Sequence, residues 1–128
     1  MEGKIIIKYR YLLDDGWVFY TLDEIESDNT VGAEILNHNY KARNQFTGIQ
    51  DKNGKDIYEG DIVAFYYKEE LCIGKITFEA GMFIIACDDL EDSYVPLFEL
   101  VCSDLFCEEV KLIGNKYENK ERNICNEF

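Results

Sequence analysis

Residues 45–63, QFTGIQDKNGKDIYEGDIV, decide the fold. This stretch contains two sharp bends that separate short runs of residues favouring β-strand. In the first bend, residues 51–55, the Asp51 side chain can accept backbone N–H bonds, and the Asn-Gly pair that follows tolerates left-handed backbone geometry. The second bend is the Glu-Gly-Asp sequence of residues 59–61. Such a pattern predicts short antiparallel strands joined by tight turns.

The same pattern continues on both sides of this stretch, because Val, Ile, Tyr, Phe and Thr dominate and turn signals are closely spaced. A hairpin is expected about Asp-Asp-Gly, residues 14–16. Gly74 lies inside an expected strand and predicts a bulge or a tight bend there. Residues 94–106 show helix-like spacing, with Pro96 placed to start one or two helical turns. Residues 23–44 fit either a strand or a helical turn. The expected strands are residues 5–13, 17–22, 45–49, 56–58, 62–67, 71–78, 82–87 and 109–114.

Several short strands about ten residues apart are typical of a sandwich or a small barrel. The fold class predicted is therefore mainly β: a small SH3-like barrel with an N-terminal β-hairpin extension and a short helical turn. The predicted division of the chain is an N-terminal hairpin and connecting segment at 1–44, a barrel core at 45–119 and a polar C-terminal tail at 120–128.

Composition indicates one soluble globular domain of 128 residues, with 47% hydrophobic and 14% aromatic residues. The net charge of −13 disfavours direct binding of nucleic acid, because phosphates repel such a chain. No apolar run approaches the ~18 residues of a membrane-spanning helix. Five cysteines, an odd number, and the lack of a secretory core favour a reducing, cytoplasmic location.

The charge is unevenly distributed, since residues 76–110 contain no Lys, Arg or His. One interpretation is a solvated surface that keeps the protein soluble. The other is an acidic face that meets a basic partner or imitates nucleic acid. Glu79 belongs to this stretch, and the candidate interaction face comprises Asp88, Asp89, Glu91, Asp92, Glu99, Asp104, Glu108 and Glu109.

Catalytic and metal-binding patterns are weak. Nucleophilic catalysis usually needs a His base, and the single histidine, His38, lies in a polar loop-like setting. Cys102 and Cys107 lack the second ligand pair that zinc sites use. Glu59 and Asp61 could do acid–base chemistry, but turn capping by Asp is the simpler interpretation. We therefore expect no catalytic, cofactor or metal residues, and no enzyme activity.

The N-terminal strand interleaves cations and aromatic rings, namely Lys4, Lys8, Tyr9, Arg10 and Tyr11. Aromatic rings flanked by cations can stack on nucleic-acid bases. In a hairpin the same residues more often line the two faces of a strand, and the acidity of the chain favours this second interpretation.

The stretch 45–63 closely resembles the central motif of the YopX-like family of bacteriophage and prophage proteins. A second motif, VKLIGNKYEN at 110–119, also matches, and residues 6–20 resemble the usual start of the family more loosely. The matching positions are Gln45, Phe46, Thr47, Gly48, Asp51, Gly54, Tyr58, Glu59, Gly60, Asp61, Ile62, Val63, Ile113, Gly114, Asn115, Tyr117 and Asn119. We expect these residues to form turns, caps and core, with Phe46, Ile49, Ile57, Tyr58, Ile62 and Val63 in the core.

The resemblance implies a mostly β protein with an SH3-like barrel core, encoded by a phage or prophage of a low-GC Gram-positive host, with no catalytic residues to carry over. We accordingly expect a non-enzymatic accessory protein that binds a host or phage protein, or a second copy of itself, in the bacterial cytoplasm. The alternative is a protein linked to nucleic acid. It would either bind directly through the basic-aromatic strand or act as an acidic DNA mimic on a host DNA-binding protein.

Overall fold

The computed structural model describes residues 6–27, 30–31, 40–87, 94–100 and 109–117. The chain divides into two compact units, Met1–Gly48 and Ile49–Phe128, and each is described by itself below. The sequence-based boundary after Asn44 falls inside a strand that runs from Ala42 to Gln50, so the strand itself carries the chain from the first unit into the second.

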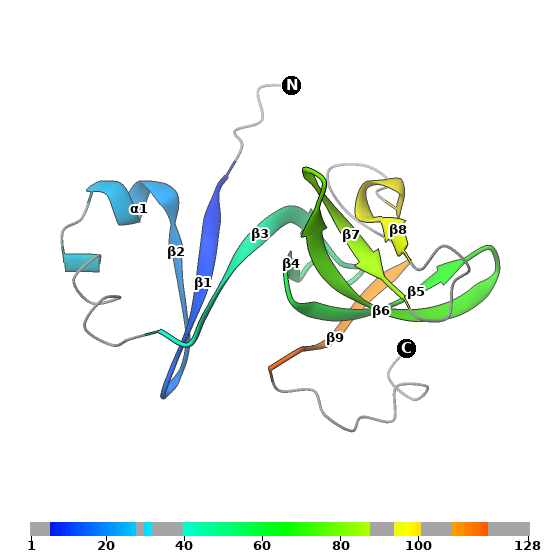
Figure 1. The fold of residues 1–128 in the computed structure, drawn as a ribbon, viewed down its shortest axis with the longest axis horizontal. Coiled ribbons are helices and arrows are strands. Elements are labelled where there is room, and N and C mark those ends of the chain that lie inside the picture. The colour runs from blue at the N-terminus through cyan, green and yellow to red at the C-terminus, as the bar shows by residue number, and fades with distance from the viewer. Residues whose placement is uncertain (1–5, 28–29, 32–39, 88–93, 101–108, 118–128) are drawn as a thin grey trace. The chain divides into compact units, whose positions relative to one another are not determined.

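The described residues are mainly strand, as predicted, and both sheets are antiparallel (Figure 1). One sheet has the order β2-β1-β3-β4 and the other β8-β7-β6-β5-β9. The helices are α1 (Leu22–Ser27) and a 3-10 helix, η1 (Leu97–Leu100). The strands are β1 (Lys8–Leu13), β2 (Gly16–Thr21), β3 (Ala42–Gln50), β4 (Asp56–Tyr58), β5 (Asp61–Tyr67), β6 (Glu70–Glu79), β7 (Met82–Ala86), β8 (Tyr94–Pro96) and β9 (Val110–Asn115).

The first unit contains the predicted hairpin, in which Leu13 pairs with Gly16 and two residues form the turn. Because side chains alternate along a strand, one face of β1 carries Tyr9, Tyr11 and Leu13. Tyr11 and Leu13 are buried, and the partly buried residues packed against them are Tyr9, Val18, Tyr20, Ile25 and Val31. This small cluster is the core of the first unit.

Helix α1 is an element that the sequence left open between strand and helical turn. Thr21 and Glu24 form a reciprocal cap at its start: the Glu24 N–H donates to Thr21 Oγ1 (3.1 Å), and the Thr21 N–H donates to Glu24 Oε1 (2.8 Å). The Thr-Leu-Asp-Glu sequence is a capping box, a local signal that predicts a helix start. Residues 31–36 form a short apolar patch after it, of which only Val31 lies within the described residues.

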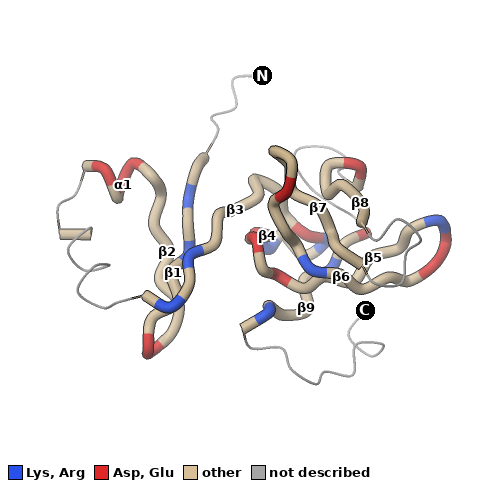
Figure 2. The backbone as a smooth tube through the Cα atoms, in the orientation of Figure 1, with Lys and Arg blue, Asp and Glu red and all other residues tan. Residues whose placement is uncertain are grey.

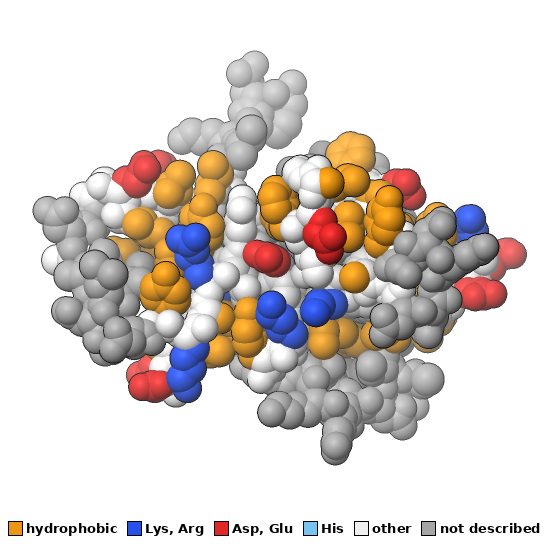
Figure 3. All heavy atoms as spheres, viewed as in Figure 1, with side chains coloured by type: hydrophobic (Ala, Val, Ile, Leu, Met, Phe, Trp, Pro, Cys, Tyr) orange, Lys and Arg blue, Asp and Glu red, His pale blue; other side chains and the backbone are white. Residues whose placement is uncertain are grey.

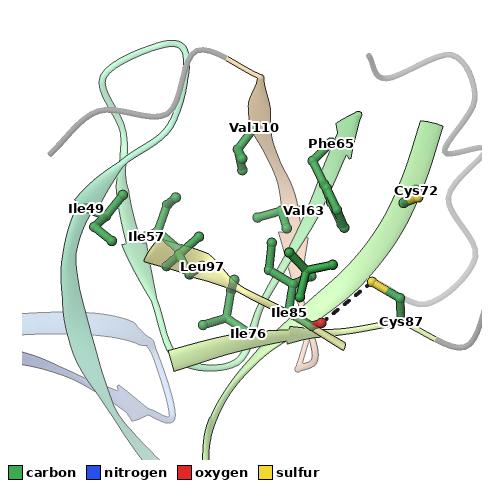
Figure 4. Close-up of a cluster of buried hydrophobic side chains, with 11 residues drawn as sticks. Ile49, Ile57, Val63, Phe65, Cys72, Ile76, Ile85, Cys87, Leu97 and Val110 are labelled. Atoms are coloured by element: carbon green, nitrogen blue, oxygen red, sulfur yellow. Dashed lines mark hydrogen bonds between the residues drawn. The ribbon is translucent and has the colours of Figure 1, made fainter. Parts of the chain in front are cut away.

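The second unit is built on the five-stranded sheet, whose inner face packs into one apolar core (Figure 4). Register places Val63 and Phe65 on the same face as Cys72 and Ile76, and Ile85 lies opposite Ile76. The core residues are Ile49, Ile57, Val63, Phe65, Cys72, Ile76, Ile85, Cys87, Val95, Leu97 and Val110.

Three details differ from the sequence-based expectation. First, the described strands of the second unit have an open order with β8 and β9 at its ends, and no closed barrel is found among them. Second, β6 runs without a bulge at Gly74, and the register shift lies between β5 and β9, at Ile62/Val63. Third, Pro96 ends strand β8, and the helical turn begins one residue later.

Gly74 lies where β6 passes from its pairing with β5 to its pairing with β7, and close packing requires a glycine there. A Cβ at this position would lie 2.5 Å from Cγ2 of Ile85, 2.7 Å from Sγ of Cys87 and 2.8 Å from the Ala86 carbonyl oxygen. Adjacent strands therefore approach each other at a point where only glycine leaves room.

Candidate functional site

The first bend of the motif is organised by the carboxylate of Asp51, which is fully buried. Its Oδ1 accepts the N–H groups of Asn53 (2.8 Å) and Lys55 (2.9 Å), which closes the turn. Its Oδ2 accepts the N–H of Leu112 in β9 (2.8 Å), 61 residues away. The Lys52 N–H also donates to the Val110 carbonyl (2.8 Å). The bend thus binds β9 on the side away from β5 and joins the two sequence motifs.

The second bend is organised in a similar way. Asp61 is 1% exposed, and its Oδ2 accepts the Tyr58 N–H (2.7 Å). Gly60, with φ of 91°, donates its N–H to Ile76 of β6 and accepts the N–H of Lys116 after β9, both at 2.8 Å. Positive φ is a conformation that glycine adopts without strain. This bend therefore connects β6 to the end of β9.

Other motif residues serve the same framework. The Asn115 side chain is buried and its Oδ1 accepts the Tyr117 N–H (2.9 Å), and Gly54 has φ of 77° in the first turn. Asn119 lies outside the described residues. Five motif residues, Asp51, Gly54, Gly60, Asp61 and Asn115, thus form or cap turns.

The predicted core residues of the motif are mostly buried. Ile49, Ile57, Tyr58 and Val63 are buried, as expected. Phe46 and Ile62 are only partly buried, so these two predictions were wrong. Phe46 lies under a cation in the first unit, and Ile62 lies on the face of the five-stranded sheet that is turned away from the core.

The proposed acidic face lies largely outside the described residues. Of its members, only Glu99 and Glu109 are described, and both are exposed, as is Glu79 of the same acidic stretch. The remaining members, Asp88, Asp89, Glu91, Asp92, Asp104 and Glu108, are not described. Whether these carboxylates form one surface therefore stays a prediction.

Residues 76–110, the stretch without basic residues, carry exposed aromatic rings. The sequence analysis did not identify these rings as candidate site residues. On η1, Phe98 is 76% exposed although its neighbour Leu97 is fully buried in the core. On the β6–β7 hairpin, Phe78 is 50% exposed and packs edge-on against Phe83, with 4.8 Å between the ring centroids. Helix η1 contacts β7. Helix η1 has only four residues, which is too short for a sequence pattern to indicate which of its apolar side chains are buried and which are exposed.

The first unit pairs cations with aromatic rings, and Figure 2 shows the basic positions along β1 and β3. The Lys8 Nζ lies 4.5 Å from the Phe46 ring centroid. The Arg10 guanidinium lies 4.4 Å from the Trp17 ring, and its Nε donates to Asn44 Oδ1 (3.0 Å). Arg10 is buried, so its charge serves the packing of the sheet in this structure. The ring partners Trp17 and Phe46 come from neighbouring strands, which the N-terminal sequence alone cannot indicate.

The described residues contain neither a metal-binding cluster nor a membrane-spanning helix. These residues contain no group of three His, Cys, Asp or Glu side chains placed to hold a metal ion. His38, Cys102 and Cys107, the sequence candidates for catalysis or metal binding, lie outside them. None of the helices within the described ranges is long and apolar enough to cross a membrane.

Comparison with known proteins gives one family. The family model described as YopX protein matches residues 11–122, which covers both motifs and most of the chain. No curated protein matches the sequence.

Proposed function

Because the chain belongs to the YopX protein family, we propose that it is a phage- or prophage-encoded accessory protein that works in the bacterial cytoplasm as a non-enzymatic protein-interaction module. The phage origin rests on the resemblance of the two motifs. An SH3-like arrangement of the second unit is part of the proposal, supported by five antiparallel strands with a 3-10 helix before the last.

The observation that carries the interaction role is the exposure of Phe98 beside the buried Leu97. Aromatic residues are enriched in protein interfaces, because a rigid ring buries a large area at low entropic cost. Phe98 is held on a helix that the core anchors, and Glu99 beside it is exposed. The partner that fits is a protein that offers an apolar pocket with basic groups at its rim.

The non-enzymatic part of the proposal is supported by the use of the motif carboxylates. Both oxygens of Asp51 accept backbone N–H groups, and an oxygen of Asp61 does so too. A carboxylate that caps a buried turn is a poor general base, because proton transfer would break the turn.

Site-specific crosslinking tests the interaction role. Phe98 is replaced by the photoreactive benzoylphenylalanine in the full chain, and cells of the host are irradiated. The matched control carries the same residue at Asn53, an exposed turn position far from η1 in sequence. We expect a discrete adduct of defined mass from position 98 only. Equal labelling from both positions, or no adduct from position 98, contradicts the proposed interaction surface.

The second candidate function is direct binding of single-stranded nucleic acid, and the cation–aromatic pairs of the first unit favour it. Exposed Phe19 lies on the same face of the β1–β2 hairpin as the partly exposed Lys8, so a ring and a cation share one face, whereas Arg10, directly opposite Phe19, is buried. Fluorescence anisotropy with a labelled oligonucleotide tests this function. Binding at low salt that weakens steeply as salt rises supports it, and no binding at the lowest salt removes it. The DNA-mimic alternative depends on acidic residues that lie outside the described ranges. Its test is whether added DNA displaces this chain from a basic host protein that it has captured.

A further inference from the structure

The first bend, residues 51–55, holds the one Asn-Gly pair in the chain, Asn53 and Gly54. In an open chain an asparagine followed by glycine is chemically reactive, because glycine has no side chain to hinder attack of its nitrogen on the asparagine amide. Both residues are exposed, so water reaches them. The bend therefore contains a group that can react without an enzyme.

The reaction is deamidation. The Gly54 backbone nitrogen loses its proton to solvent and forms a bond to Cγ of the Asn53 side chain. The bond from Cγ to the side-chain nitrogen breaks, and ammonia leaves with a proton taken from solvent. Water then opens the resulting succinimide ring at either of its carbonyl groups. One opening gives aspartate, and the other gives isoaspartate, in which the backbone runs through the former side chain. Water is the only co-reactant.

The folded turn withholds the nitrogen that this reaction needs. The Gly54 N–H donates to the Asp51 carbonyl oxygen at 2.9 Å, so the proton that must leave is held in a hydrogen bond. The N–H groups on either side, those of Asn53 and Lys55, donate to Asp51 Oδ1 at 2.8 Å and 2.9 Å. A carboxylate this close disfavours a second negative charge on the Gly54 nitrogen. The bond from Leu112 to Asp51 Oδ2 fixes the same carboxylate in place.

We propose that Asn53 is a modification site under the control of folding: the closed turn suppresses deamidation, and opening of the turn releases it. Native proteins open locally and expose single hydrogen-bonded amides without unfolding as a whole. The rate in the folded chain is then the rate in the unfolded chain multiplied by the fraction of time that the turn is open. This inference goes beyond the proposed function and does not depend on the crosslinking result at Phe98.

Isoaspartate makes the opening permanent. It lengthens the backbone by one carbon between residues 53 and 54, so Asn53 and Lys55 lose the spacing at which both N–H groups reach Asp51 Oδ1. Because the same carboxylate binds Leu112, the change also loosens the contact with β9. Aspartate, the other product, keeps the backbone unaltered. Figure 3 shows acidic and basic side chains spread over the visible face of the second unit, so one further exposed carboxylate changes little there.

A time course of the full chain tests the control by folding. The chain is kept at mildly alkaline pH, folded in buffer or unfolded in urea, and then digested. Mass spectrometry measures the fraction of Asn53 that has become a carboxylate, and a capped peptide of residues 49–58 in both solvents corrects for the effect of urea. We expect deamidation to be at least about tenfold slower in the folded chain than in the unfolded chain. Equal rates, or no product in urea, overturn the proposal.

Amide hydrogen exchange at Gly54, measured by nuclear magnetic resonance, assigns the protection to the turn. Exchange and attack both need the same N–H to leave its hydrogen bond. Relative to the peptide, the slowing of Gly54 exchange should therefore match the slowing of deamidation within about threefold. Slow deamidation beside a Gly54 amide that exchanges freely would assign the protection to another cause and overturn the proposal.

The products test the permanent opening. The isoaspartate form is isolated from aged chain by chromatography and compared in urea unfolding with Asn53→Asp, the matched control, which carries the same charge on an unaltered backbone. We expect a lower urea midpoint for the isoaspartate form and an unchanged midpoint for Asn53→Asp. Equal midpoints in the two would show that the lengthened backbone leaves the turn intact, which contradicts the permanent opening.

Discussion

At the scale of single residues, Asp51 connects two parts of the chain that are far apart in sequence. One side chain closes its own turn and binds a strand 61 residues away. Its oxygens accept three backbone N–H groups in a fully buried setting. Hydrogen bonds to a charged group contribute more than neutral ones, and a buried N–H left without a partner is costly.

Replacing Asp51→Asn should therefore destabilise the protein by about 2–3 kcal/mol, because the amide nitrogen of Asn cannot accept an N–H. Urea unfolding followed by far-ultraviolet circular dichroism measures the loss. Asp56→Asn is the matched control: its Oδ1 accepts an exposed Gln50 amide (3.1 Å), which is worth about 1 kcal/mol or less. Equal losses in the two variants would show that burial of Asp51 carries no special stability.

Gly74 permits a second residue-scale prediction. Gly74→Ala should cost about 1–3 kcal/mol, because the added methyl group overlaps Ile85, Cys87 and a backbone carbonyl that cannot rotate away. Thermal unfolding measures the change, with Glu70→Ala at the exposed start of the same strand as control. An alanine variant as stable as the original chain would mean that β6 and β7 can separate freely at this point.

At the scale of elements, local turn chemistry was predictable and long-range pairing was not. The bend at 51–55 follows from Asp-x-Asn-Gly alone, and strand β4 was predicted at its observed bounds. The bond from Asp51 to Leu112 has no local signal, since it needs β9 to be placed beside the turn. The same reason explains the barrel prediction: closure depends on which strands pair, and strand spacing does not determine pairing.

Two hairpins carry residues that fit their turns poorly. Lys68 and Glu69 join β5 to β6 as a two-residue turn, and both have positive φ, at 52° and 67°. Type I′ turns of this kind favour Asn-Gly. Lys68→Asn combined with Glu69→Gly should therefore stabilise the protein by about 1–2 kcal/mol.

Thermal unfolding at a low, fixed protein concentration checks this gain. Ala80→Asn provides an independent comparison, because Ala80 occupies the same kind of position in the β6–β7 turn, with φ of 53°. We expect a smaller gain there, since only one residue is relieved. A lower melting temperature in the Asn-Gly variant would show that the side chains of Lys68 and Glu69 stabilise the hairpin more than the backbone strain destabilises it.

At the scale of the whole molecule, the two units differ in the size of their cores. Eleven buried residues form the cluster of the second unit, whereas Tyr11 and Leu13 alone form that of the first among the described residues. A unit with a small core buries little apolar surface, so its free energy of unfolding is small. We therefore expect the first unit to unfold at lower denaturant concentration than the second.

The single tryptophan makes this expectation measurable. Trp17 lies in the first unit, with the Arg10 guanidinium over its ring, so its fluorescence reports that unit alone. In urea, the tryptophan signal should change at a lower midpoint than the circular dichroism of the strands. Asp51→Asn, a change in the second unit, should shift the dichroism midpoint and leave the Trp17 midpoint in place. A common shift of both signals would show instead that the two units unfold as one cooperative body, because destabilisation in one would then reach the other.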